Sequence, residues 1–396
     1  MALRITIHGS YGTGNRGDNC ILIQLLRFLE QEAPRSEVTV LCRDEERLGA
    51  LLAKEMPDSN LQLRTLHHSF KRRGLAVLKA CMGCDLFILG GGGLLWGKAS
   101  GNLGYWLLRP RLALLAGRKL VFYAPGIYDI RGGRAQRLLG NVAKKAHFLS
   151  VRDREGLQEL MRAGVSEDRI VLGADPAFLL PPADYEAGQA LMENLRIQEG
   201  RRIALSARDW KGRLSAGLFA RFVLTLLEDS TTTLIFFPFK TGGLASDTDR
   251  NDAEVGRRLL LTLPKEFQHR IVLLGNDLRS EDYINLMSHC DVLIGMRLHS
   301  LIFATLAGTP FGALPYDRKI ETYMEMLGRK DRLMGTKEFS LKDNQEDLLA
   351  RLEAERDNLP EGPVVSILMA GAELAGRARA MHAELSRRLR EWFPDA

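Results

Sequence analysis

The stretch DVLIGMRLHSLIFATLAG, residues 291–308, has the pattern of a β-strand followed directly by an α-helix. The apolar run 292–294 is short and closed by Gly295, which is typical of a buried parallel strand. From Leu298 to Ala307 the composition favours a helix that packs on several sides, and Gly308 ends it. A strand that feeds a helix through so short a turn predicts an α/β fold with a parallel sheet.

Arg297 and His299 fall at the end of this strand and in the first turn of the helix. Ligands of open α/β sheets bind at that edge, and the helix N-terminus offers N–H groups to phosphate or carboxylate. An arginine beside a histidine therefore predicts a site that binds an anion and moves a proton. The alternative is that the histidine only caps the helix and the arginine is a solvated surface charge. The apolar surroundings argue against this alternative, because both groups would lose their solvation there.

Length and composition predict a globular protein of two domains that binds anions. The chain has 396 residues, which is too long for one ordinary core, and it is 45% hydrophobic and 26% charged. Its net charge of +6 favours anionic ligands or the negative surface of a membrane. Clusters of Lys and Arg interleaved with aromatic residues are missing, so we expect no nucleic-acid partner.

Targeting signals are also missing from the sequence. The start, MALRITIH, passes directly into a strand, and no apolar run reaches membrane-spanning length. We therefore expect a cytoplasmic protein, with peripheral contact at the inner face of the membrane as an open alternative.

Cysteine usage gives no clear metal site. Five cysteines in a chain of this size indicate a reducing compartment. Cys81 and Cys84 form a single CxxC, and His67 and His68 lie in a strand-to-helix loop. Because no second CxxC is present, we expect these cysteines to pack in the core, and we expect neither a metal nor a cofactor.

Residues 1–183 predict one doubly wound domain, in which strands and helices alternate. Its first loop, residues 9–18, matches GxGxxG, with Asp44 after the next strand, but polar residues occupy the turn. We expect this loop to line a ligand cleft or to form a structural turn. The four glycines of residues 90–93 predict a close approach of the backbone to another element or to a ligand. Trp96, Tyr105 and Trp106 follow, and we expect them to stack on a sugar ring or to pack in the core.

Residues 184–370 predict a second domain of the same class, after the break at residues 180–184. Cationic side chains follow four of its strands, and in a parallel sheet they would converge on one edge. They are Arg208, Lys240, Arg297 and the pair Arg318 and Lys319.

The chain looks helical from residue 344 to residue 393, and residues 371–396 predict a C-terminal helix. Met381, Leu385, Leu389 and Trp392 form one apolar stripe, with arginines on the opposite face. We expect the helix to pack back across the domains, and the alternative is a helix at a membrane surface.

Two Rossmann-like domains that face a cleft, with a C-terminal helix, describe the GT-B architecture. Seven further stretches run in order over most of the chain: GSYGTGNRGD (9–18), LFILGGGGLL (86–95), LSVRDREG (149–156), GADPAFLL (173–180), FFPF (236–239), IGMRLHSLIFATLAGTP (294–310) and PYDRKIE (315–321). In these stretches the chain resembles the polysaccharide pyruvyl transferases, the bacterial ketal-pyruvyl transferases of cell walls and exopolysaccharides.

The resemblance implies transfer of the enolpyruvyl-derived group of phosphoenolpyruvate onto two hydroxyls of a saccharide, which forms a pyruvate ketal and phosphate. His299 would protonate the enol ether with Arg297 beside it, and the donor would also meet Arg208, Leu298, Lys240 and Arg152. The acceptor residues would be Gly14, Asn15, Asp18, Gly92 and Gly93. The base that receives the hydroxyl proton stays open among Asp18, Asp175 and Asp317.

Three other functions compete with this one. A GT-B glycosyltransferase would use a nucleotide-sugar donor and bind a ribose through Glu321. An NAD-dependent oxidoreductase would use the GxGxxG loop. A non-catalytic saccharide-binding protein is the fourth possibility, but it gives no reason for His299 beside clustered arginines.

Overall fold

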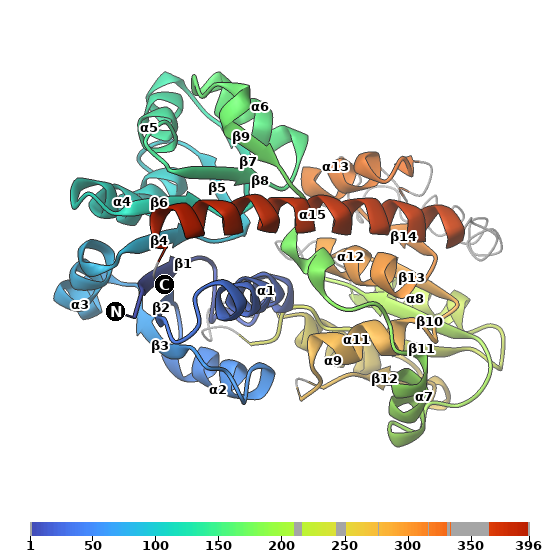
Figure 1. The fold of residues 1–396 in the computed structure, drawn as a ribbon. Coiled ribbons are helices and arrows are strands. Elements are labelled where there is room, and N and C mark those ends of the chain that lie inside the picture. The colour runs from blue at the N-terminus through green and yellow to red at the C-terminus, as the bar shows by residue number, and fades with distance from the viewer. Residues whose placement is uncertain are drawn as a thin grey trace. The chain divides into compact units, whose positions relative to one another are not determined.

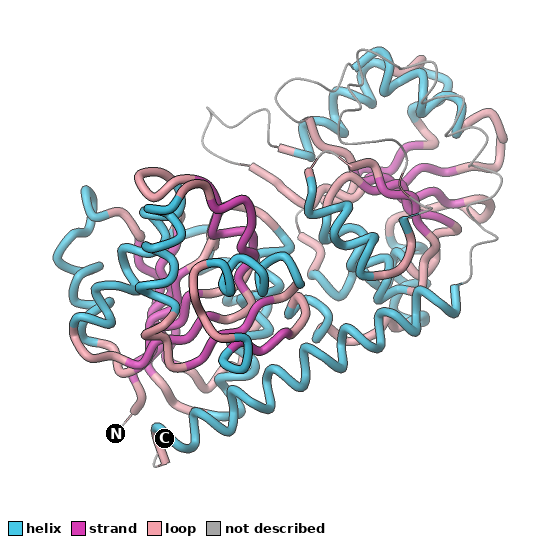
Figure 2. The backbone as a smooth tube through the Cα atoms, turned by 90° about the horizontal axis from the view of Figure 1, so that it is seen from above, coloured by secondary structure: helices cyan, strands magenta, loops and turns pink. Residues whose placement is uncertain are grey.

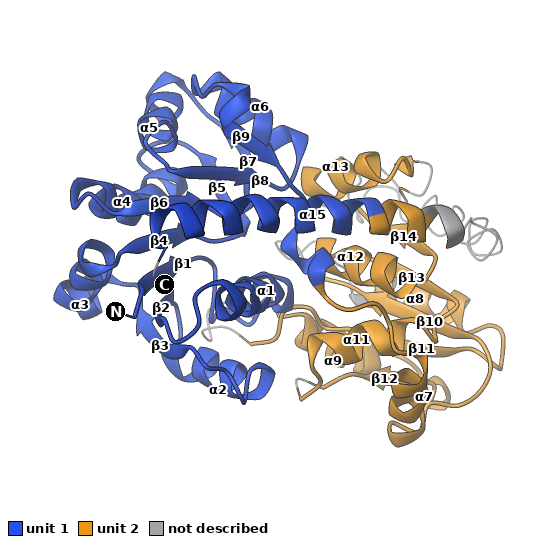
Figure 3. Ribbon diagram, in the orientation of Figure 1, with its two compact units in different colours: residues 1–179, 373–396 blue, residues 180–372 orange. Residues whose placement is uncertain are grey.

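The computed structural model describes residues 2–209, 216–242, 251–275, 277–315, 317–330, 333 and 364–394. Figure 3 colours two compact units: unit 1 comprises residues 1–179 and 373–396, and unit 2 comprises residues 180–372. The domain boundary predicted at residue 183 lies a few residues after this division. The C-terminal helix, predicted from residue 371, begins earlier, at Val364.

Unit 1 is built on a seven-stranded sheet in which every pairing is parallel. The strands lie in the order β3-β2-β1-β4-β6-β8-β9. The chain begins at the inner strand β1, adds β2 and β3 toward one edge and then adds the remaining strands toward the other edge, which confirms the predicted doubly wound topology. Strands such as β4 are buried at every position, as a sheet covered on both faces requires. The strands are β1 (Arg4–His8), β2 (Glu37–Cys42), β3 (Gln62–His67), β4 (Leu86–Leu89), β6 (Lys119–Phe122), β8 (Phe148–Val151) and β9 (Ile170–Leu172).

Helices cover both faces of this sheet (Figures 1 and 2). Helices α1 and α2 share one core with the C-terminal helix α15, and α3 to α6 pack on the opposite face. The helices and 3-10 turns are α1 (Arg16–Glu32), α2 (Glu45–Glu55), α3 (Phe70–Gly83), α4 (Asn102–Leu115), α5 (Gly133–Ala143), α6 (Arg154–Arg162), η1 (Glu167–Arg169), η2 (Pro176–Leu179) and α15 (Val364–Trp392).

A small second sheet of unit 1 did not follow from the sequence. Strands β5 (Gly92–Gly97) and β7 (Pro125–Ile130) pair in parallel, with shifts in register. Three of the six residues of β5 are glycine, so the segment shows no alternation of apolar and polar residues. The glycine run therefore passes into a strand and is not only a loop.

The stripe predicted on the C-terminal helix is the face that packs on unit 1. Met381, Leu385 and Leu389 are buried in the core with α1 and α2. Arg387 on the outer face pairs with Glu384 and Glu391 of the same helix. These contacts confirm that the helix packs back on the fold. Within the described residues, no helix is long and apolar enough to cross a membrane.

His382 makes the docking of α15 sensitive to pH. Its Nε2 lies 2.5 Å from the buried hydroxyl of Tyr123. Burial lowers the pKa of His382 from 6.5 to about 4, and burial lowers the pKa of His68 to about 4 as well. Between about pH 4 and pH 6.5, these two histidines bind protons in the unfolded chain but not in the folded one. Stability is therefore complete above pH 6.5 and falls as the pH drops toward 4.

We expect urea unfolding to show this loss of stability below pH 6.5. The variant His382→Gln can keep a hydrogen bond to Tyr123 but has no proton to gain. Its free energy of unfolding should therefore depend less steeply on pH, by up to about 1.4 kcal/mol per pH unit. The same slope in the variant and the parent would contradict the burial argument.

Unit 2 contains a five-stranded sheet of order β12-β11-β10-β13-β14, again with every pairing parallel. Helices surround it, and α8 and α9 share a core with β10, β11 and β13. The beginning of α15 adds Leu368 and Gly371, which lie against Gly308 and Thr305. The predicted helical segment before residue 364 lies outside the described residues. The elements are α7 (Tyr185–Asn194), β10 (Arg202–Ser206), α8 (Ala216–Leu226), β11 (Thr233–Phe236), α9 (Asp252–Thr262), α10 (Lys265–Gln268), β12 (Ile271–Leu273), α11 (Ser280–Met287), β13 (Val292–Gly295), α12 (Leu298–Ala307), β14 (Phe311–Ala313) and α13 (Arg318–Met326).

Candidate active site

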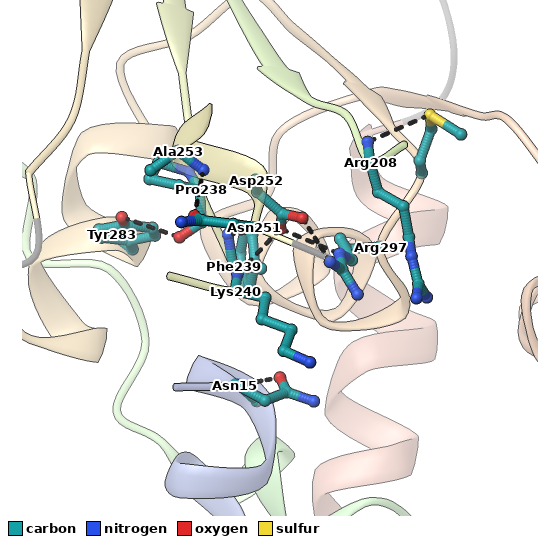
Figure 4. A network of polar contacts seen from close by, with 12 residues as sticks. Asn15, Arg208, Pro238, Phe239, Lys240, Asn251, Asp252, Ala253, Tyr283 and Arg297 are labelled. Carbon is teal, nitrogen blue, oxygen red and sulfur yellow. Dashed lines mark hydrogen bonds and ion pairs between the residues drawn. The ribbon is translucent and has the colours of Figure 1, made fainter. Parts of the chain in front are cut away.

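The carboxyl ends of the strands of unit 2 bring cationic side chains to one edge of the sheet. Arg208 follows β10, Lys240 follows β11 and Arg297 follows β13, and these three strands are adjacent and parallel. The backbone N–H of Arg208 approaches Sδ of Met296 at 3.5 Å, which ties two of the strand ends together. Figure 4 shows the three cationic side chains at this edge. Arg318 and Lys319 begin α13, directly after β14, at the same edge.

Helix α12 has the bounds that the sequence predicted and places His299 in its first turn. Arg297 is the N-cap, and its carbonyl accepts hydrogen bonds from the N–H and the hydroxyl of Ser300 at 3.0 and 2.7 Å. Gly308 ends the helix with a φ of 73°, a conformation that a side chain would disfavour. The helix is buried from Leu298 to Thr305, so His299 and Arg297 reach the strand edge from a rigid, covered element.

A buried ion pair holds Arg297 in place. Its Nε donates to Oδ2 of Asp252 at 2.9 Å, and its Nη2 contacts Oδ1 of the same carboxylate (Figure 4). The Asp252 side chain is 1% exposed and also accepts hydrogen bonds from the backbone N–H groups of Phe239 and Lys240, at 3.1 and 2.8 Å. Asp252 therefore orients the guanidinium and the loop that carries Lys240, and it balances the charge of Arg297.

Asp252 is a site residue that the sequence analysis missed. It is the first residue of α9, and Asn251 caps that helix by accepting the N–H of Ala253 at 3.1 Å. An Asn-Asp pair at a helix start was a visible signal for a capped N-terminus, where carboxylates are favoured. The signal did not indicate that this carboxylate is buried or that Arg297 is its partner.

Aromatic side chains hold the loop that follows β11. The rings of Phe237 and Phe239 pack edge-on against Tyr283, with centroids 5.3 and 5.6 Å apart. Phe239 also meets Phe303 of α12 at 5.1 Å, and the Tyr283 hydroxyl donates to the carbonyl of Pro238 at 3.2 Å. The FFPF motif thus fixes the backbone of Lys240 relative to the helix that carries His299.

In unit 1 the structure brings together several of the residues predicted to bind an acceptor. Asn15 caps α1, its side chain accepts the N–H of Gly17, and its Nδ2 donates to Oδ2 of Asp18 at 2.8 Å. Asp18 is buried, and a Cβ added to Gly92 would lie 2.8 Å from its Oδ1. Gly14 belongs to the same loop, and Gly93 follows Gly92 on β5 with its surface exposed.

The glycine run approaches protein elements at its first two positions. A Cβ at Gly90 would lie 2.0 Å from the hydroxyl oxygen of Tyr11, and one at Gly91 would lie 2.6 Å from Ile21. Tyr11 is fully buried, and burial together with nearby Asp18 raises its pKa. Of the two explanations left open by the sequence, contact with another element accounts for these two glycines.

Arg152 lies in unit 1 and is paired with acids. Its Nη1 donates to Asp175 at 3.0 Å and its Nε to Asp153 at 3.3 Å, and all three side chains are largely covered. Gly126 leaves room for this guanidinium, because a Cβ there would lie 2.9 Å from Nη2. Within unit 1, Gly126 lies against both Arg152 and Gly93. The predicted contact of Arg152 with the donor stays a prediction.

All three candidate bases make contacts within the protein, and Asp18 accepts from Asn15 as described above. Asp175 pairs with Arg152 and accepts the N–H of Ala177 at 3.1 Å. Asp317 caps α13 by accepting the N–H of Lys319 at 3.3 Å.

The dinucleotide and metal patterns have structural explanations. Gly12 has a φ of 70° and passes close to the backbone of Asp44, whose side chain caps α2 by accepting the N–H of Arg47 at 3.0 Å. Cys81 and Cys84 are buried, and burial raises their pKa to about 12 and about 11. Among the described residues, no three His, Cys, Asp or Glu side chains are grouped so that they could hold a metal ion.

Comparisons with known proteins agree with this architecture. The family model for polysaccharide pyruvyl transferase matches residues 15–318. The amylovoran biosynthesis protein AmsJ of Erwinia amylovora is 22% identical over an alignment that covers 91% of this chain and 93% of AmsJ.

Solved structures show the same fold. Anabaena HepE in complex with UDP and glucose has a TM-score of 0.61 at 14% identity, with 98% of this chain and 100% of the HepE chain covered. A putative UDP-N-acetylglucosamine 2-epimerase from Listeria monocytogenes has a TM-score of 0.65 at 14% identity, with 100% and 98% covered. These matches confirm the predicted GT-B-like fold class.

Proposed function

The chain belongs to the polysaccharide pyruvyl transferase family, and on that premise we propose that it transfers the enolpyruvyl-derived group of phosphoenolpyruvate onto two hydroxyls of a saccharide. The family places it among the transferases of polysaccharide biosynthesis. The product would be a cyclic pyruvate ketal, with phosphate released. No cofactor enters this scheme.

The cationic edge of unit 2 is the observation that carries the proposal. Phosphoenolpyruvate has a phosphate and a carboxylate only a few atoms apart, so it requires several fixed donors. Arg208, Lys240 and Arg297 follow adjacent strands there, and the N–H groups at Leu298 open α12 beside them. Each charge-assisted hydrogen bond to the donor would contribute about 1.5–3 kcal/mol.

His299 supplies the proton in this proposal. Protonation of the terminal methylene carbon makes the neighbouring carbon electrophilic, and the first hydroxyl attacks it. The bond to the phosphate oxygen then breaks, and the second hydroxyl closes the ketal. Of the two hydroxyl protons, one replaces the proton given to carbon and the other leaves with phosphate. A positioned acid of this kind supplies about 10²–10⁴-fold in rate.

Unit 1 would hold the acceptor, with Asp18 as the base. Its carboxylate lies beside Gly92 and is held by Asn15, in the loop that also carries Gly14. Gly93 is exposed at the start of β5, where a sugar can approach the backbone. We rank Asp175 and Asp317 below Asp18, because the guanidinium of Arg152 balances the charge of Asp175 and Asp317 caps a helix of unit 2, whereas the partner of Asp18 shown here is the neutral amide of Asn15.

Incubation with phosphoenolpyruvate and a panel of saccharides tests the proposal. The panel should contain free, polymeric, nucleotide-linked and lipid-linked acceptors. We expect phosphate release that depends on the acceptor, and mass spectrometry of the acceptor should show a pyruvate ketal. Release of a nucleoside diphosphate from a nucleotide sugar, without phosphate release from phosphoenolpyruvate, would instead favour a GT-B glycosyltransferase.

A further inference from the structure

Acidic side chains are almost absent from one segment of unit 1. Residues 59–128 contain ten Lys and Arg and one acid, Asp85, so the segment has a net charge of +9 while the whole chain has +6. Asp85 itself pairs with Arg4 at 2.7 Å. Lys and Arg are no denser here than elsewhere, which is why the sequence shows no basic cluster. The segment is distinctive because its basic side chains have few acidic partners.

Two adjacent helices of this segment expose leucines. Helices α3 and α4 lie side by side on one face of the seven-stranded sheet, and their inner sides enter the core (Figure 1). Their outer sides carry Leu75 at 86% exposure, Leu115 at 79% and Leu108 at 41%, and Leu78 and Tyr105 are exposed as well. Large apolar side chains that gather on one surface indicate a partner more strongly than scattered ones do.

The exposed stripe of α4 is mostly apolar, whereas the exposed stripe of an ordinary surface helix is polar. Its exposed positions recur at helical spacing, at Tyr105, Leu108, Arg111 and Leu115. A surface helix normally places polar residues on that stripe. Here three of the four side chains are aromatic or aliphatic, and the fourth is an arginine.

Basic side chains accompany these leucines. Lys71, Arg72 and Lys79 of α3 and Arg111 of α4 are exposed. Lysine and arginine can lay their stems along an apolar surface and keep their charges at its edge. Leucines with cationic neighbours and no acid on either helix match the two requirements of a surface that binds anionic lipid.

We propose that this α3–α4 face, made of Lys71, Arg72, Leu75, Leu78, Lys79, Tyr105, Leu108, Arg111 and Leu115, binds the surface of an anionic lipid bilayer. The leucines would enter the boundary between headgroups and acyl chains, and the cations would meet lipid phosphates. A two-fold contact with a second copy would set one positive face against another without compensating acids. A hydrophilic polyanion bound to this face could meet the cations, but it would leave the leucines exposed to water.

The structure argues against the alternative that the C-terminal helix α15 lies at a membrane surface. The apolar stripe of α15 is buried in unit 1. Arg387 and Arg388 of its outer face pair with acids of the same helix, and Arg390 pairs with Glu32 of α1. The face on α3 and α4 lies elsewhere on unit 1. Among the described residues, its four basic side chains form no ion pair with an acid, while Arg73 beside them pairs with Glu45 of α2 at 3.8 Å.

Sedimentation with lipid vesicles tests the proposal. We expect the intact protein to bind vesicles of phosphatidylcholine mixed with phosphatidylglycerol and not vesicles of phosphatidylcholine alone. Added salt should weaken this binding, because it screens the charges. The triple variant Lys71→Gln, Arg72→Gln, Lys79→Gln should partition about 100-fold more weakly. Leu75→Ser with Leu115→Ser should weaken partitioning at least about 10-fold.

Leu261→Ser is the matched control, because Leu261 is 65% exposed on α9 of unit 2. It should bind vesicles as the parent does, and thermal unfolding should show that all variants fold. Absent vesicle binding by the parent, or equal binding by all variants, would overturn the proposal. Dimerisation or capture of an acidic protein that the leucine variant abolishes, without lipid binding, would also overturn it by assigning the face to a protein partner.

The lipid proposal stands apart from the proposed reaction. The α3–α4 variants should release phosphate from phosphoenolpyruvate at the parental rate when the acceptor is water-soluble. Failure of vesicle binding would therefore leave the reaction untouched, and an absent reaction would leave vesicle binding untouched.

Discussion

Replacing His299 by glutamine is expected to lower kcat for pyruvyl transfer by about 10²–10⁴-fold while the Kd for phosphoenolpyruvate changes little. Glutamine fills similar space in the first turn of α12, where His299 is buried, so the fold should tolerate it. It can still hydrogen-bond, but it cannot transfer a proton to carbon. His299→Ala should show the same separation of turnover from binding. Single-turnover phosphate release gives the rate, and calorimetry gives the Kd.

His289→Gln provides the matched control. This histidine belongs to the same unit, but its ring stacks on Tyr185 with centroids 4.0 Å apart and its Nε2 lies 2.8 Å from the Tyr185 carbonyl. Its replacement should leave kcat within about twofold, as expected for a residue outside the chemistry. Full turnover in His299→Gln would remove His299 from the mechanism. A weakened Kd with unchanged kcat would make it a donor-binding residue instead.

The position of His299 was predictable because it depends on neighbouring residues alone. A short β-branched run, a turn and an apolar helix appear in eighteen consecutive residues, and each follows from local rules. The parallel order of the sheet then placed Arg208, Lys240 and Arg297 at one edge. Alternation of strands and helices had predicted that order, and the apolar stripe on α15 likewise identified its buried face.

The partners of these residues were not predictable in the same way. Asp252 meets Arg297 across 45 positions of sequence, and nothing in the local pattern selects it among the chain's many acids. Gly90 is adjacent to Tyr11 only because β4 lies beside β1 in the sheet. The pairing of β5 with β7 depends on the same long-range contacts, and its glycines conceal the strand. Local sequence patterns therefore predicted where the cations lie. Long-range contacts of the fold determine which of these cations are paired with acids.

Asp252→Asn is expected to destabilise unit 2 by about 3–5 kcal/mol, because it leaves the Arg297 guanidinium buried without its counterion. The amide keeps the shape of the side chain, but it offers one acceptor oxygen to contacts that now use two. Urea unfolding measures the loss. Glu254→Gln on the same helix is the control, since Glu254 pairs with Arg257 and Arg258 at the surface and should cost no more than about 1 kcal/mol.

A double-mutant cycle with Arg297→Gln separates the structural part of this effect from donor binding. If the pair acts as a unit, the double variant should be more stable than the sum of the two single losses predicts, by about 1–3 kcal/mol. Loss of phosphoenolpyruvate binding in Arg297→Gln at temperatures where it remains folded would show that the guanidinium also meets the donor. A loss below about 1 kcal/mol in Asp252→Asn would contradict a tight buried pair. Asp252 would then tune the charge at the strand edge, and the donor would meet a more cationic site in the variant than in the parent.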